Sequence, residues 1–168
     1  MTTTRRAFGA LAAGAALATL APAPAAGAHS AHHRGRLIAR DDFRHGLGQW
    51  AVELEKGGTV TAARGTLEAE VPAGATIWFR QRLEGPYVIE YTATPVSEGG
   101  VNDRVSDLNN FWNAVDARSP EDIFATRRGG QPAEYDYLKT NGHFAFRTTW
   151  SHFRFSDFRV WRPNPQHR

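Results

Sequence analysis

The sequence predicts an all-β domain whose strands form a sandwich of two antiparallel sheets. Three features of the 168 residues support this fold class. Apolar and polar residues alternate over short segments, turn-forming residues separate these segments at close intervals, and no segment after the first 28 residues keeps a helical period. Many short strands with closely spaced turns are typical of sandwiches.

The first 28 residues have the composition of an export signal. Arg5 and Arg6 form the positive end, an Ala- and Leu-rich run follows at 7–20, and Ala26-Gly27-Ala28 offers small residues for cleavage. Thr4-Arg5-Arg6-Ala7-Phe8 resembles the twin-arginine signal, and an ordinary secretory signal is the alternative. We therefore expect an exported protein, either secreted or in the cell envelope. The apolar run is too short to span a membrane, so no stable membrane anchor is expected after cleavage.

A short flexible lead-in is expected at residues 29–36. Its histidines His29, His32 and His33 leave a copper or nickel site open as an alternative to a mobile end. The β-sandwich domain is expected over residues 37–163, and residues 164–168 form a tail.

The first half of the domain is expected to be a meander of short strands. Five stretches have strand character: 37–43, 49–53, 59–62, 66–71 and 76–80. In the stretch 66–71 the apolar residues face one side and the two glutamates the other. A turn is expected at Pro72-Ala73-Gly74.

The second half of the domain continues this pattern. Residues 87–94 are partly apolar on both sides, which suggests a central strand, and a polar loop is expected at 96–106. The Phe-rich stretch between 143 and 161 alternates cleanly except at Ser156-Asp157. This break predicts a β-bulge.

The composition excludes several classes of function. Without any cysteine, the chain can form no disulfide, no thiolate metal site and no cysteine nucleophile. The formal net charge of +3 falls to about +1 once Arg5 and Arg6 are removed, so no nucleic-acid partner is expected. We expect no cofactor, although Asp41 and Asp42 could bind a structural calcium ion. Capping and turn roles are the alternative for both residues.

Several stretches together resemble a family of exported bacterial domains of unknown function that is related to the concanavalin A-like lectins and glucanases. They are Asp41-Asp42-Phe43 with Trp50, 107–112 with 124–128, Tyr135-Asp136, and 146–152 with 158–161. The resemblance implies a jelly-roll sandwich and a setting in polysaccharide degradation, without a settled reaction.

The chain departs from that family in its middle. Lys139-Thr140 passes almost directly to Asn141-Gly142-His143, where the relatives carry several further strands. An incomplete sandwich would have exposed sheet edges. The alternative is a natural minimal version in which Asn141-Gly142 forms a tight hairpin turn.

Polar and aromatic residues in the matching stretches are candidates for glycan contact. Aromatic faces stack on pyranose rings, while amides and guanidinium groups bind hydroxyls and carboxylates. The candidates for substrate binding are Asn109, Asn110, Trp112, Arg127, Arg128, Tyr137, Arg147 and Trp150. Tyr135 and His152 are candidates for a catalytic base. Each of these residues could instead serve only packing, sheet edges or a solvated surface.

Three functions remain open on these residues. The first is a glycan-recognising domain with little or no catalysis of its own, whose partner is a polysaccharide or oligosaccharide. The second is a polysaccharide lyase on uronate-containing glycans, in which Arg127 and Arg128 bind the carboxylate and Tyr135, Tyr137 or His152 is the base. The third is a purely structural or degenerate domain.

A glycoside hydrolase is disfavoured by the stretch that most resembles one. Glu134-Tyr135-Asp136-Tyr137-Leu138-Lys139 is similar to the retaining β-glucanase pattern, in which two glutamates flank an aspartate. Lys139 stands where the second glutamate is needed. Retaining cleavage requires two carboxyl groups about 5 Å apart.

Overall fold

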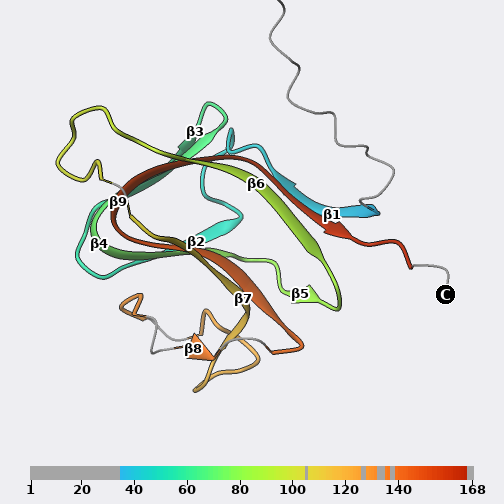
Figure 1. The fold of residues 1–168 in the computed structure, drawn as a ribbon. Helices are drawn as coiled ribbons and strands as arrows, with labels where there is room; N and C mark the ends of the chain where they lie inside the picture. Colours follow the sequence, from blue (N-terminus) through green and yellow to red (C-terminus); the bar gives the residue numbers. More distant parts are fainter. Residues whose placement is uncertain (1–34, 105, 126–127, 132–134, 137–138, 166–168) are drawn as a thin grey trace, which may run out of the picture.

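The computed structural model describes residues 35–104, 106–125, 128–131, 135–136 and 139–165. These residues form antiparallel strands and no helix (Figure 1). The strands are β1 (Arg36–Asp41), β2 (Trp50–Leu54), β3 (Thr59–Ala63), β4 (Thr66–Phe79), β5 (Leu83–Glu84), β6 (Val88–Pro95), β7 (Leu108–Asp116), β8 (Tyr135–Asp136) and β9 (Asn141–Arg162). The predicted all-β class is therefore confirmed.

Parts of the expected domain layout lie outside the described residues. These parts are the export signal at 1–28, most of the His-rich lead-in and residues 166–168 of the tail. Within the described ranges, no helix has the length and apolar character needed to cross a membrane.

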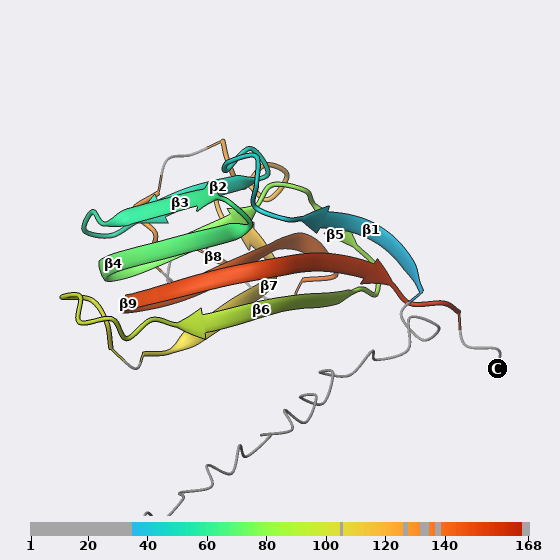
Figure 2. The ribbon, with the colours of Figure 1, turned by 90° about the horizontal axis from the view of Figure 1, so that it is seen from above.

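The long strand β9 is the centre of the sheet. β4 pairs along its residues 145–155, β7 along 143–148 and β6 along 153–161. β1 and β5 pair with its two ends. β2 and β3 extend the sheet beyond β4, and β8 extends it beyond β7. Figure 2 shows β3, β4, β9 and β6 side by side in this order.

The sheet is strongly curled because β4 and β9 bend at the same level. Their register shifts between Val71 and Gly74, opposite the residues on either side of Trp150. Trp150 has a positive φ of 42° at this point. A β-bulge bends a strand and increases its twist. In Figure 1 both strands turn back on themselves at this bend.

The main core fills the inside of the curl. Phe146 and Phe155, which lie on opposite sides of the bend in β9, stack with their ring centroids 4.3 Å apart. The buried members of this core are Phe43, Trp50, Leu67, Ala69, Ile77, Phe79, Leu83, Phe144, Phe146, Phe153, Phe155, Phe158 and Val160. Burial of so many aromatic side chains supplies the main stabilisation of a domain without disulfides.

A smaller cluster lies on the outside of the curl. Ala145 alternates with Phe144 and Phe146 in β9, so its side chain points away from the main core. It packs with Trp78, Phe111, Ala114, Ile123 and Tyr135. Ile123 and Tyr135 come from the turn segment after β7 and from β8, so these parts of the chain cover the outer surface here.

Three local expectations are wrong. Pro72-Ala73-Gly74 does not reverse the chain, because it forms the bulge inside β4. Asn141-Gly142 does not form a hairpin turn. It forms the start of β9, where it pairs with Glu84 and Leu83. The expected central strand at 87–94 is β6, which pairs with β9 alone among the described strands and has no fully buried residue. Its apolar residues pack against the edge of the core.

Two other local expectations are confirmed. Leu67, Ala69 and Val71 are fully buried, while the two glutamates between them point outward. The predicted bulge is present at Asp157, which has a positive φ of 57°. The register of β6 on β9 shifts at this point, between Glu90 and Thr92.

Candidate functional site

A buried polar network lies on the outside of the curl, where β2 runs beside β4. Glu53 of β2 is opposite Thr76 of β4 in register, so its side chain shares the outer surface with Trp78. The Glu53 carboxylate accepts hydrogen bonds from Trp78 Nε1 at 2.9 Å, from Arg128 Nε at 3.1 Å and from the Tyr135 hydroxyl. Glu53 is therefore the residue that joins β2, β4, β8 and the segment around Arg128.

Arg128 connects Glu53 to a second buried carboxylate. Its Nη1 donates to Asp116 Oδ2 at 2.7 Å, and its Nη2 lies 3.0 Å from Glu53 Oε1 without the geometry of a hydrogen bond. The guanidinium also lies 5.3 Å from the ring centroid of Tyr135. Two carboxylates of the protein already neutralise this buried cation. Arg128 therefore serves mainly in structural ion pairs, and less as a group that binds the carboxylate of a ligand.

The network favours a protonated Tyr135 and an ionised Asp116. Burial raises the pKa of Tyr135, and the Glu53 carboxylate raises it further. Burial opposes ionisation of Asp116, but hydrogen bonds from the Arg118 backbone N–H and from Arg128 hold the pKa of Asp116 below its usual value. A tyrosine with a raised pKa stays protonated at neutral pH, so almost no phenolate is present to act as a general base.

Arg147 occupies a similar position next to this network. Its Nη1 donates to the carbonyl oxygen of Gly130 at 2.8 Å, and its Nη2 pairs with Glu55. Thr76 Oγ1 donates to the same Gly130 carbonyl at 3.2 Å. Asn109 is opposite Arg147 in the register of β7 and β9 and is exposed. Arg147 therefore fastens the chain near Gly130 to the sheet.

An open depression of about 450 Å3 lies along the edge strand β2, beside the network. This volume falls within the range of small-molecule sites. The depression is lined by Ala51, Val52, Glu53, Leu54, Arg80, Phe124 and Arg128.

Arg80 and Phe124 are the side chains of this depression that a ligand could contact. The exposed Arg80 guanidinium lies 5.4 Å from the Phe124 ring centroid, and its Nε donates to the Trp50 carbonyl at 3.1 Å. Phe124 is supported by an edge-to-face contact with the His143 ring at 5.0 Å. Burial lowers the pKa of His143, so this ring is a neutral support at pH 7.

Most of these residues belong to the stretch between β4 and β8. Residues 69–141 match a family described as a domain of unknown function, DUF6250. The DUF6250 match includes Trp78, Arg80, Asp116, Phe124, Arg128 and Tyr135 and excludes Glu53 and Arg147. No curated protein and no solved structure matches the chain.

Two expected contact residues of the DUF6250 stretch lie on the other side of the sheet. Asn110 exchanges hydrogen bonds with the Tyr91 hydroxyl at 2.9 and 3.1 Å. Trp112 stacks on Tyr87 with ring centroids 5.7 Å apart and meets Phe144 of the main core edge to face. Asn110 and Trp112 therefore close the core between β6 and β7 and are not part of the depression.

The two candidate bases, Tyr135 and His152, belong to separate networks. His152 Nδ1 lies 2.6 Å from Asp103 and its Nε2 lies 2.8 Å from Glu68. Burial alone would lower the pKa of His152, but these two carboxylates outweigh burial and raise it. The protonated ring is thus held by two acceptors, whereas Tyr135 contacts Glu53 and Arg128.

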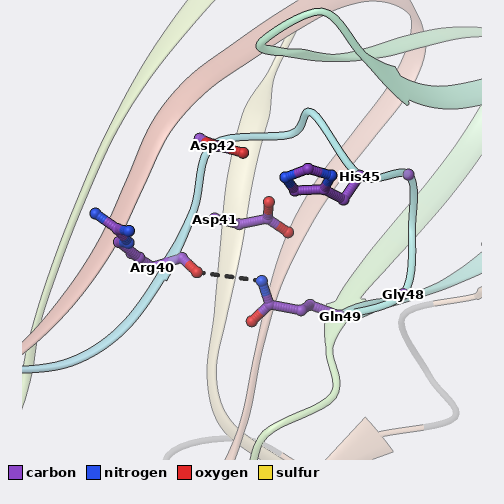
Figure 3. Close-up of a pocket in the computed structure, with 7 residues that line it drawn as sticks. Arg40, Asp41, Asp42, His45, Gly48 and Gln49 are labelled. Atoms are coloured by element: carbon purple, nitrogen blue, oxygen red, sulfur yellow. Dashed lines mark hydrogen bonds between the residues drawn. The ribbon is translucent and has the colours of Figure 1, made fainter.

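Asp41 and Asp42 line a smaller depression of about 280 Å3 at the turn after β1 (Figure 3). Asp41 accepts hydrogen bonds from the Phe43 backbone N–H and from Trp50 Nε1, both at 2.8 Å. Asp42 accepts one from the Arg44 N–H at 3.1 Å. Both side chains thus have the turn role that was the alternative to calcium. Among the described residues, no group of three or more His, Asp or Glu side chains is arranged so that it could hold a metal ion.

Some candidates lie outside the described residues, and others were missed. Arg127, Tyr137 and Glu134 fall in the first group. Glu53 and Arg80 fall in the second, because a single charge within or just after a strand usually marks a solvated position. An acidic residue near Trp50 and an arginine after a buried run give no local signal that they line the same depression.

Proposed function

We propose that this domain recognises glycans through the depression lined by Arg80 and Phe124, with little or no catalysis of its own. The observation that supports the proposal is an exposed guanidinium beside an aromatic ring in an open depression. Aromatic rings pack against the apolar face of a pyranose, and guanidinium groups bind carboxylates and hydroxyls in their own plane. Arg80 therefore replaces Arg127 and Arg128 as the proposed contact for a uronate.

A lyase is the second candidate, and the site supports it less well. A lyase needs a group that removes a proton next to a carboxylate. The raised pKa of Tyr135 and the two carboxylates that hold the proton of His152 both work against this role. Recognition without proton transfer requires neither residue as a base.

The proposal also includes the setting of the domain. A concanavalin A-like jelly roll is supported by the packing of Phe146 against Phe155 across the curl, together with the resemblance of the stretches quoted above. Export by the twin-arginine route is supported by residues 1–28. An exported glycan-recognising domain would act beside enzymes that degrade polysaccharides.

Isothermal titration calorimetry with oligogalacturonate and with a neutral oligosaccharide of equal length tests this function. We expect Phe124→Leu to weaken both interactions about two- to tenfold, since an aromatic contact contributes about 0.5–1.5 kcal/mol. We expect Arg80→Ala to weaken the acidic ligand about tenfold or more and the neutral ligand less, because hydrogen bonds to charged groups contribute about 1.5–3 kcal/mol.

Arg44→Ala is the matched control, because Arg44 is an exposed arginine outside the depression. Its titrations should equal those of the unchanged protein. The proposal is wrong if neither oligosaccharide binds at millimolar concentration, or if Arg44→Ala and Arg80→Ala weaken binding equally.

A further inference from the structure

Trp150 has a backbone conformation that tryptophan rarely adopts. Its φ of 42° lies in the left-handed region, where glycine and asparagine are the usual residues. The position is the bulge at which β9 bends. A large β-sheet residue at such a position indicates that its side chain has a use that offsets the strain.

The Trp150 side chain does not contribute to either core. It is 51% exposed, the largest exposed fraction among the tryptophans described. The guanidinium of Arg104 lies 4.0 Å from the centre of the indole ring, close enough for a cation–π contact. A stacked guanidinium keeps its N–H groups free at its edge, where they can bind an anion.

The loop that carries Arg104 is fastened to β9 close to Trp150. Asp103 contacts His152, and the backbone N–H of Val96 donates to the His152 carbonyl at 2.9 Å. Asn102 Nδ2 also donates to Glu70 of β4 at 3.2 Å. These contacts hold Arg104 over the indole at a low cost in conformational entropy on binding.

We infer that Trp150 and Arg104 form a second ligand site, which binds an acidic pyranose. The sugar ring packs against the exposed part of the indole, and its carboxylate accepts hydrogen bonds from the edge of the Arg104 guanidinium. This site shares no residue with the depression at Arg80 and Phe124, so each site can fail without the other.

The indole N–H resonances in a two-dimensional NMR spectrum test this inference directly. The Trp150 signal is assigned from its loss in Trp150→Phe. Titration with oligogalacturonate should shift the Trp150 indole signal and the Arg104 Nε signal together. A neutral oligosaccharide of equal length should need at least a tenfold higher concentration for the same shift.

Two variants separate the second site from the first. Arg80→Ala should leave the Trp150 response unchanged, even if binding at the depression is lost. Arg104→Ala should remove the preference for the acidic sugar, and Arg44→Ala should preserve it. The inference is overturned if the Trp150 signal of the unchanged protein stays fixed at several millimolar oligogalacturonate, or if Arg104→Ala responds like the unchanged protein.

Discussion

His152 connects two carboxylates that belong to different parts of the chain. Asp103 comes from the loop after β6, and Glu68 comes from β4. Glu68 also accepts a hydrogen bond from Arg154 Nε at 2.8 Å, and Glu70 lies opposite His152 in register. Backbone N–H groups of the loop and then His152 lower the pKa of Asp103 to about 2. The imidazolium and the Arg154 guanidinium therefore balance this acidic cluster together.

Stability should fall as the pH rises through the raised pKa of His152. The protonated His152 ring contributes fully to the free energy of unfolding below the pKa of histidine in the unfolded chain, about 6.5. This contribution is lost above the pKa of His152 in the folded protein, because a neutral ring can donate to only one carboxylate. Urea unfolding between pH 6 and 9 measures this slope. His152→Gln should flatten it. His143 has a lowered pKa and acts in the opposite direction, reducing stability as the pH falls below about 6.5.

Arg128 gives a second prediction at this scale. Arg128→Leu removes the cation between Asp116 and Glu53 and leaves both carboxylates without it, which should cost about 3–5 kcal/mol in urea unfolding. Arg118→Ala is the control at the same carboxylate. Arg118 is exposed and should cost less than about 1 kcal/mol. Equal losses in the two variants would contradict the buried network.

The sequence identified several of these buried polar residues as candidates for sugar binding or catalysis, which stays a prediction. It selected Arg128, Arg147, Tyr135 and His152 because they are the residue types that bind or convert acidic sugars. The partners of these residues could not be read in the same way, since Glu53 is 75 residues away from Arg128 along the chain. Only the curled sheet brings them together.

The sequence predicts the strands well where the alternation of apolar and polar residues determines which side chains are buried. Leu67, Ala69 and Val71 are buried as their spacing requires, and the break at Ser156-Asp157 is a bulge. The proline and glycine of Pro72-Ala73-Gly74 led to the wrong prediction of a turn. They form a bulge between two parts of one strand. Turn residues do not distinguish a chain reversal from a bend in a strand, because both need the same backbone freedom.

The pairing of β7 with β9 depends on a close approach at Gly142. A Cβ at this position would lie 2.4 Å from the carbonyl carbon of Asn113 and 2.7 Å from the Ala114 carbonyl oxygen. Gly142→Ala should therefore cost about 1–3 kcal/mol in urea unfolding by forcing the strands apart. Gly48→Ala is the control, since nothing lies within 4 Å of its Cβ. Its effect should stay within about 0.5 kcal/mol.

At the scale of the whole molecule, the curl decides which residues can act together. Alternation predicts the two faces of each strand, but the bend at Trp150 determines which faces enclose the core and which remain outside. Tyr135 and His152 are therefore in separate networks, although they lie only 17 residues apart in the chain. The depression lies where the edge strand β2 is next to the segment with Phe124 and Arg128, which covers the sheet. The residue pattern within one strand does not show which distant segment will lie beside it.

A crystal structure of the protein with bound oligogalacturonate would test glycan recognition most directly. We predict a sugar ring against Phe124, with its carboxylate within hydrogen-bonding distance of the Arg80 guanidinium. A saturated complex in which the depression beside β2 holds only water would contradict the account.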